Sequence, residues 1–227
     1  MRGLYAIIDV TTLRARGLSI ASFARAVAAA KPCALQLRAK DASSSETLSL
    51  LREIHPACRE AGVPLFANDR VDLAVLVGCE GVHVGQDDMP VSLARSIGRG
   101  LKIGISTHDL AQVERAIADR PDYVAFGPVF ATKSKANPDP VVGVDALSEV
   151  VRLCDRPVVA IGGIDAERMA EVGRVCPVAA VIGALVPEGL GPNDMQWVTD
   201  RARELHATLV RAWELRAEKS SLPVGGR

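Results

Sequence analysis

Three polar side chains early in the chain have the types and the spacing of an anion-binding site. Gln36, Arg38 and Lys40 occupy alternate positions in QLRAK, a segment that begins inside an apolar run. Residues two apart in an extended segment point to the same side, so one amide and two cations would face one ligand. A guanidinium offers paired donors and an ammonium a point charge, which together suit a pyrophosphate. Lys40 alone would be interpreted as a solvated loop residue, but the triplet favours a functional site.

Two carboxylates follow the next two apolar runs. Asp69 ends VPLFAND, and Asp88 ends GVHVGQDD. If these runs are adjacent parallel strands, the two carboxylates lie close together and repel each other unless a cation separates them. A site with few protein oxygen ligands, next to cations that bind phosphate, suits a Mg²⁺ ion that is shared with a pyrophosphate. The alternative is structural: Asp69 pairs with Arg70, and Asp87 or Asp88 caps the following helix.

A long loop after the sixth apolar run adds hydroxyls and a third cation. It reads GPVFATKSK and continues through ANPDPVVG. Loops of this length without structure of their own often act as lids or binding loops. Thr132 and Ser134 could donate to phosphate oxygens, and Lys135 adds positive charge. The alternative is a solvated basic loop.

Glycines follow the seventh and eighth runs, at Gly163 and Gly183. Glycine lets backbone N–H groups approach an anion closely, and the loops after the last two strands of a (β/α)₈ barrel are a recurrent phosphate site. Together with Thr132 and Ser134, these glycines predict a second anion site. Two anion sites in turn suggest two phosphorylated substrates.

The fifth run ends in Ser106, Thr107 and His108, and it offers a hydroxyl to a ligand. A Ser or Thr at the start of a helix is most often a cap, so this signal is weak by itself. His83 lies in the middle of GVHVG, where a packed interior histidine is expected. Neither histidine is therefore placed in the catalytic set, and no pairing of a nucleophile with a base is evident.

The elements that must position these residues are short apolar runs separated by helix-like segments. The runs begin near residues 4, 33, 63, 81, 101, 122, 157 and 178. They are rich in Val, Ile and Ala with little alternation, which is typical of parallel strands buried on both faces. The pattern predicts an α/β fold, a single-domain (β/α)₈ TIM barrel over residues 1–219, with a flexible tail at 220–227.

The rival fold is an open, doubly wound sheet, which usually carries a Gly-rich phosphate loop after its first strand. The first run ends instead in Asp9-Val10-Thr11. In the barrel, the residues that follow each strand meet at one face, and that face carries the active site. The barrel would therefore gather the polar residues described above.

Helix boundaries are also predicted from the sequence. Ser19, Thr107 and Asp165 are expected as N-caps, and Ser43 begins a capping box with the Glu three residues later. Pro56 lies inside the second helical pattern and is expected to kink or split that helix.

Composition excludes several classes of protein. Lys+Arg and Asp+Glu each number 27, so the chain lacks the excess of basic charge that a general nucleic-acid binder needs. Its 5 cysteines are scattered, which predicts free thiols in a cytoplasmic protein. No signal peptide is expected, and no apolar run reaches the about 18 residues that would span a membrane.

The motifs QLRAK, NDRVDLA, GVHVGQDDMP, GISTH, GPVFATKSK and AIGGI, in this order, resemble the thiamine phosphate synthase family. The resemblance covers nearly the whole chain except the tail. It implies a transferase that joins a hydroxymethylpyrimidine diphosphate to a thiazole phosphate and releases pyrophosphate. It also implies that the pyrimidine diphosphate ionises first and that the thiazole nitrogen then attacks with its own lone pair. Such a reaction needs no general base.

The resemblance assigns roles to individual residues. The pyrimidine diphosphate ligands would be Gln36, Arg38, Lys40, Asn68, Ser106 and Lys135, of which Arg38, Lys40 and Lys135 form the catalytic set. The Mg²⁺ ligands would be Asp69 and Asp88. The thiazole phosphate site would be Thr132, Ser134, Gly163, Ile182 and Gly183. The expected partners are these small molecules, and a homo-oligomer is compatible with the pattern.

The chain departs from the family pattern at three positions: Ala131 replaces the usual Pro, Ser134 the usual Thr, and Gly183 a common Ser. Two other functions stay open. A thiazole tautomerase of the same fold would use a histidine such as His108, but it has no evident use for Asp69 and Asp88 as metal ligands. A non-catalytic barrel would bind thiamine phosphates without turnover.

Overall fold

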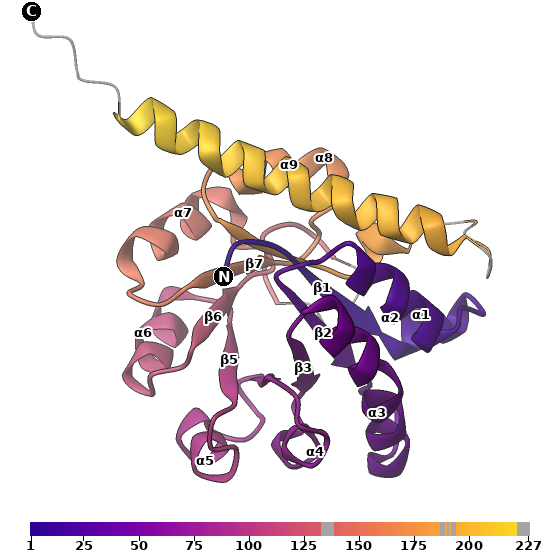
Figure 1. The fold of residues 1–227 in the computed structure, drawn as a ribbon. Helices are drawn as coiled ribbons and strands as arrows, with labels where there is room; N and C mark the ends of the chain where they lie inside the picture. The colour runs from indigo at the N-terminus through magenta and orange to yellow at the C-terminus, as the bar shows by residue number, and fades with distance from the viewer. Residues whose placement is uncertain (133–138, 187–188, 190, 192–193, 222–227) are drawn as a thin grey trace, which may run out of the picture.

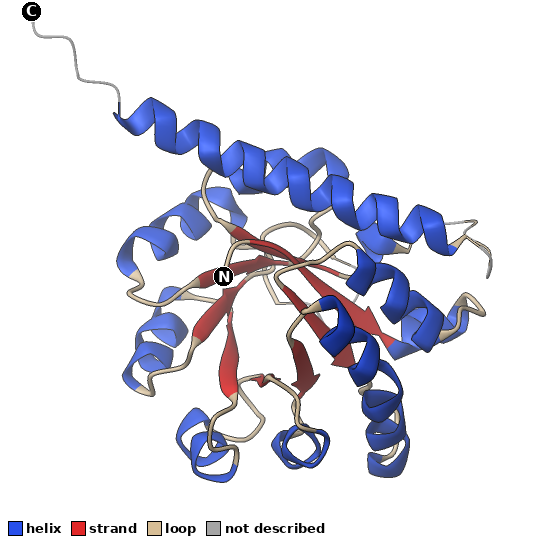
Figure 2. Ribbon diagram, viewed as in Figure 1, coloured by secondary structure: helices blue, strands red, loops and turns tan. Residues whose placement is uncertain are grey.

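The computed structural model describes residues 1–132, 139–186, 189, 191 and 194–221, with side chains as far as Arg216. A closed barrel of parallel strands forms its centre, in the order β1-β2-β3-β4-β5-β6-β7-β8, with β8 paired to β1. The helices surround these strands (Figure 2). The predicted (β/α)₈ barrel is therefore confirmed. The strands are β1 (Gly3–Asp9), β2 (Ala34–Arg38), β3 (Leu65–Asn68), β4 (Gly81–Val84), β5 (Lys102–Thr107), β6 (Tyr123–Phe126), β7 (Val158–Ile161) and β8 (Val178–Val181).

The outer layer consists of helices that each bury an apolar face against the strands. The helices are α1 (Val10–Ala15), α2 (Ile20–Ala29), α3 (Ser44–Ala61), α4 (Val71–Val77), α5 (Val91–Ile97), α6 (Leu110–Ala118), α7 (Gly143–Leu153), α8 (Ala166–Gly173) and α9 (Met195–Ser221), with a short 3₁₀ helix η1 (Gly183–Leu185). The long α9 lies beside α8 and α2 and passes the start of β1 (Figure 1). It ends at Ser221, inside the segment 220–227 that was predicted as a tail.

Side chains at the helix starts confirm most of the predicted caps. Ser19, Ser43 and Asp165 each accept a hydrogen bond from a backbone N–H in the first turn of α2, α3 and α8. The Thr107 prediction is wrong, because β5 continues through that residue and α6 starts later with Asp109 as its cap. The buried Thr107 hydroxyl donates instead to the carbonyl oxygen of Ala125, at 3.0 Å.

Pro56 does not split α3, which runs unbroken from Ser44 to Ala61. A proline removes one backbone hydrogen bond from a helix interior. Ile54 and Cys58, two residues before and two residues after the proline, are buried against the core. Burial on both sides of the proline offsets the missing bond, so packing overrides the local signal.

Three aromatic rings fill the inside of the barrel. Tyr5, Phe66 and Tyr123 meet edge to face, with ring centroids 5.8 Å apart in each pair. Room for them comes from glycines on neighbouring strands: a Cβ at Gly81 would overlap the Phe66 ring, and one at Gly104 would overlap the Tyr123 ring. The interior is therefore a packed core, and ligands must bind above it, at the strand ends.

None of the helices in the described part of the chain combines the length and the apolar character needed to cross a membrane. The cysteines in that part, Cys33, Cys58, Cys79, Cys154 and Cys176, are free thiols, as predicted.

Candidate active site

A cation and two carboxyl groups meet at the carboxyl ends of β2, β3 and β4. The Nζ atom of Lys40 lies 2.6 Å from Oδ2 of Asp69. Asp69 and Asp88 are in direct contact through their carboxyl groups, as the neighbouring positions of β3 and β4 predict. The alternative pairing of Asp69 with Arg70 is excluded, since Arg70 binds Asp72 at 2.5 Å. Neither Asp87 nor Asp88 caps α5, whose N-cap is Pro90.

The pKa values of these two carboxyl groups are shifted in opposite directions. Burial raises the pKa of Asp69, and the nearby Asp88 raises it further, while Lys40 opposes both effects. Burial also acts to raise the pKa of Asp88, but the contact with Asp69, the Gly85 N–H and Lys40 outweigh it, so that pKa is lowered. The Gly85 N–H donates to Asp88 Oδ2 at 2.7 Å. One carboxyl group thus holds a proton more readily than the other, as expected where two carboxylates share one place.

The backbone of Asp69 is held in an unusual conformation. Its φ is 64°, in the left-handed region that residues other than glycine adopt rarely, although Asp does so more often than most. Its N–H donates to the carbonyl oxygen of His83 on β4, at 2.7 Å. This bond ties the end of β3 to β4 and aims the Asp69 side chain at Lys40 and Asp88. Non-glycine residues held in this region concentrate at functional sites.

Arg38 is positioned by a residue that the sequence analysis passed over. The Arg38 guanidinium donates to Oδ2 of Asp9 at 2.5 Å, and the Asp9 side chain is only 6% exposed. The other oxygen of Asp9 accepts from both the N–H and the hydroxyl of Thr12, at 2.8 and 2.7 Å, and so caps α1. Asp9 therefore fixes Arg38 and the start of α1 together. The signal available in the sequence was an acidic residue at the end of the first apolar run.

Gln36 and Ser106, both predicted as ligand-binding residues, are connected through the barrel interior. The Gln36 amide nitrogen donates to the Tyr5 hydroxyl at 2.8 Å, and that hydroxyl lies 2.8 Å from the hydroxyl of Tyr123. His83 Nδ1 lies 2.9 Å from the Tyr123 hydroxyl, and His83 Nε2 lies 2.8 Å from Oγ of Ser106. His83 is buried, as predicted, and its ring stacks on Tyr123. Neither tyrosine belongs to a motif that marks it in the sequence.

The turn after β7 brings backbone groups to the same end of the barrel. Gly162 and Gly163 both have positive φ, 99° and 63°, and Gly163 packs against the backbone of the loop that follows β6. Within the described residues, no backbone carbonyl accepts a hydrogen bond from the Gly163 N–H. Such a turn leaves N–H groups available to an anion.

After β8, Ile182 packs on the interior cluster, and Gly183 begins η1. A Cβ at Gly183 would meet no atom within 4 Å. Thr132 is half-buried in the loop after β6. Ser134 and Lys135 lie outside the described residues.

Three further polar residues lie at or just after the ends of β3, β4 and β5. Asn68 ends β3 and pairs in register with His83. The Gln86 amide donates to the carbonyl oxygen of Ser106 at 2.6 Å, which ties the ends of β4 and β5 together. His108 Nδ1 contacts the carbonyl oxygen of Gly127 at 2.6 Å, and Nε2 lies 3.5 Å from Asp139. His108 therefore supports the loop after β6.

The donor set is of the kind that Mg²⁺ accepts. Asp69 and Asp88 supply carboxylate oxygens in contact with each other, and oxygen is the donor that Mg²⁺ prefers. Among the residues that the structure describes, no group of three or more His, Cys, Asp or Glu side chains is arranged to hold a metal. A two-carboxylate site of this kind is the type in which Mg²⁺ keeps waters and substrate phosphates as its other ligands.

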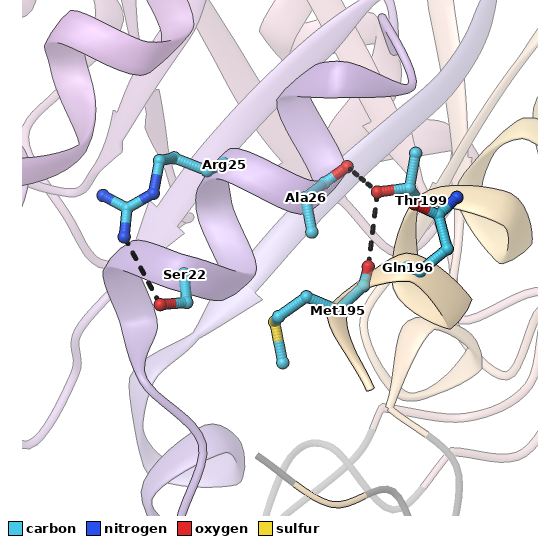
Figure 3. Close-up of a pocket in the computed structure, with 6 residues that line it drawn as sticks. All are labelled: Ser22, Arg25, Ala26, Met195, Gln196 and Thr199. Carbon is cyan, nitrogen blue, oxygen red and sulfur yellow. Dashed lines mark hydrogen bonds between the residues drawn. The ribbon is translucent and has the colours of Figure 1, made fainter. Parts of the chain in front are cut away.

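A separate pocket lies in the outer layer between α2 and α9 (Figure 3). Thr199 of α9 donates to the carbonyl oxygen of Ala26 of α2 at 2.9 Å and to that of Met195 at 3.3 Å. Ser22 and Arg25 line the opposite wall. These contacts join two helices, and none of the predicted site residues that the structure describes lines this pocket.

Fold and site together define a (β/α)₈ barrel with a cation–carboxylate cluster and a glycine turn at the carboxyl ends of its strands, the face on which barrels of this class carry their active sites. The TMP-TENI family, described as thiamine monophosphate synthase, matches residues 4–185. The chain belongs to this family.

Individual relatives resemble the chain over most of its length. It is 38% identical over 205 residues to the thiamine-phosphate synthase of Chloroflexus aurantiacus, covering 90% of this chain and 91% of that protein. It is 39% identical over 208 residues to that of Methanocella arvoryzae, covering 91% and 94%. The solved structure of thiamine phosphate pyrophosphorylase from Pyrococcus furiosus matches with a TM-score of 0.79 and 29% identity, covering 92% of this chain and 96% of that one.

Proposed function

We propose that this protein is a thiamine phosphate synthase, a transferase that joins a hydroxymethylpyrimidine diphosphate to a thiazole phosphate or its carboxylated form and releases pyrophosphate. The observation that carries the proposal is the Lys40–Asp69–Asp88 cluster at the strand ends, in a chain of this family. The names and the coverage of its relatives support the same activity. The free cysteines are consistent with an enzyme that acts in the reducing cytoplasm.

The leaving pyrophosphate determines what the site must do. Arg38, held by Asp9, presents its fork of donors to phosphate oxygens, and Lys40 adds a second positive charge beside them. Asp69 and Asp88 would hold Mg²⁺, which when bound neutralises charge on the departing group. Lys135 would add the third cation. Preorganised positive groups of this kind stabilise the charge that develops as the bond breaks.

The second substrate would bind through backbone donors. Gly163 follows β7 and Gly183 begins η1 after β8, at the same end of the barrel as the cations, and Thr132 lies in the loop after β6. Ser134 would add a second hydroxyl. Because the attacking ring nitrogen carries no proton, the reaction needs no general base. This agrees with the positions of the histidines, since His83 and His108 already make hydrogen bonds to the protein.

The test is pyrophosphate release by the purified protein with both substrates, with and without Mg²⁺. We expect release that needs all three components, with thiamine phosphate formed. Asp88→Ala and Lys135→Ala should each lower turnover on the order of 100-fold while the fold remains intact. Asp87→Ala, a matched change at the exposed neighbour of Asp88, should leave turnover near that of the wild type.

Full activity in both Asp88→Ala and Lys135→Ala would refute the site assignment. No pyrophosphate release by the wild type would refute the synthase. Proton exchange on a thiazole carboxylate phosphate would then test a tautomerase that uses His108. Binding of both phosphorylated ligands without either reaction would indicate a non-catalytic barrel.

A further inference from the structure

The polar chain inside the barrel connects side chains from five different strands. It runs from Gln36 (β2) through Tyr5 (β1), Tyr123 (β6) and His83 (β4) to Ser106 (β5), and each link is between 2.8 and 2.9 Å. Tyr5 and Tyr123 lie on strands that are not neighbours, so the chain crosses the barrel interior. Both ends are residues that the proposed function places against the pyrimidine diphosphate.

The chemistry of the donors indicates the direction of the hydrogen bonds. An amide nitrogen can only donate, so the Tyr5 oxygen accepts from Gln36. The Tyr5 hydrogen is then available to Tyr123, the other hydroxyl within reach, and the Tyr123 hydrogen is in turn available to Nδ1 of His83. With Nδ1 as the acceptor, the neutral ring carries its hydrogen on Nε2.

The last link determines what Ser106 can offer a ligand. His83 Nε2–H donates to Ser106 Oγ, so the serine hydroxyl accepts from the protein and keeps its own hydrogen for a ligand. The reverse direction would leave the Tyr5 hydrogen without an acceptor among the described residues, in a side chain whose residue is 1% exposed. Buried donors without a partner are rare because they are costly. Burial also raises the pKa of both phenols, which keeps their hydrogens in place.

We propose that Tyr5, Tyr123 and His83 form a one-way hydrogen-bond relay that holds His83 in its Nε2–H tautomer and makes Ser106 a hydrogen-bond donor to the substrate. These three are positioning residues, since they act through Ser106. The identity of that substrate rests on the proposed function, whereas the direction of the relay does not. The group placed against Ser106 must therefore be an acceptor, such as a phosphate oxygen or an unprotonated ring nitrogen.

The first test needs no activity. Nitrogen-15 NMR of the full-length, histidine-labelled protein shows which ring nitrogen of His83 carries hydrogen, and His83→Gln assigns the signals. We expect the Nε2–H form in the wild type and loss of that preference in Tyr123→Phe, which removes one hydroxyl and keeps the ring. An Nδ1–H form, a doubly protonated ring, or no change in Tyr123→Phe would overturn the relay.

The second test is a double-mutant cycle of Tyr123→Phe with Ser106→Ala. Tyr123→Phe should lower kcat/KM for the pyrimidine diphosphate about tenfold, roughly the effect of one hydrogen bond, and leave KM for the thiazole phosphate unchanged. It should add no further loss in the Ser106→Ala background. Thr107→Val, which removes a buried hydroxyl next to Ser106 but outside the relay, should leave both substrates unaffected.

The two tests separate the relay from the reaction. Additive losses in the cycle would show that Tyr123 does not act through Ser106 and would overturn the relay. An inactive wild-type protein would refute the synthase, and the NMR result would still decide the tautomer of His83 and with it the direction of the relay.

Discussion

Replacing Asp9 by Asn tests whether the buried pair with Arg38 holds the site in place. The exchange keeps the shape of the side chain, and Asn caps a helix about as well as Asp. The Oδ1 contacts to Thr12 can therefore remain. The other oxygen, which accepts from Arg38 at 2.5 Å, becomes an amide nitrogen that faces another donor. Asp9→Asn thus breaks the pair and spares the cap.

The expected cost follows from burial. A hydrogen bond to a charged group contributes about 1.5–3 kcal/mol to stability. The Asp9 side chain is 6% exposed and that of Arg38 is 20% exposed, so the released guanidinium can turn partly into water. We therefore expect the lower end of this range, about 1.5 kcal/mol. Asp9→Ala should cost about 1 kcal/mol more, because the cap of α1 is lost as well.

Urea unfolding measures these differences, with Asp109→Asn as the matched control. Asp109 caps α6 through the N–H of Gln112 and is exposed, so its replacement by Asn should cost almost nothing. The slope of the unfolding curve should be the same in all variants, which would place the change in stability rather than in the unfolded state. Equal midpoints for Asp9→Asn and Asp109→Asn would refute the argument that the Asp9–Arg38 pair stabilises the barrel.

Two further predictions concern a glycine turn and a half-buried histidine. Gly163→Ala should raise KM for the thiazole phosphate about tenfold, because its φ is positive and a Cβ there overlaps the neighbouring loop. The control is Gly62→Ala at the end of α3, which has a similar positive φ and open space around it, and equal KM values in both variants by steady-state kinetics would contradict the phosphate turn. Burial lowers the pKa of His206, so the unfolded state binds a proton first and stability should fall as the pH drops below about 6.5. The loss should be less than about 1.4 kcal/mol per pH unit, because the side chain is only half-buried and water screens its charge. In His206→Gln, the midpoint of urea unfolding should lose this dependence on pH. An unchanged dependence would contradict its attribution to His206.

The sequence was sufficient for the architecture because each strand leaves a local signal. Apolar runs recur at the spacing of strand and helix units, and all of them became strands of one barrel. The contact of Asp69 with Asp88 was predictable for the same reason, since successive strands of a (β/α)₈ barrel are neighbours. The predicted cap at Thr107 was wrong because the end of β5 depends on its pairing with β6, which reaches Thr107 itself.

Contacts across the barrel left weaker signals. The hydrogen bond between Tyr5 and Tyr123 joins strands that are far apart in sequence and not adjacent in the sheet, so no local pattern predicts it. Asp9 was visible at the end of the first apolar run, but its pairing with Arg38 depends on side-chain conformations that spacing does not determine.

One sequence signal could nevertheless have pointed to the relay. Glycine weakens a strand interior because it loses more backbone entropy on folding than other residues and has no side chain to pack. A glycine inside a buried strand therefore usually marks a close approach by another group. Gly81 pairs in register with Phe66, and Gly104 pairs with Tyr123. Each glycine makes room for the ring of its partner. A glycine opposite a tyrosine in adjacent parallel strands therefore predicts an inward phenol. Because the hydroxyl of such a buried phenol must find a hydrogen-bond partner, it also predicts polar neighbours such as His83.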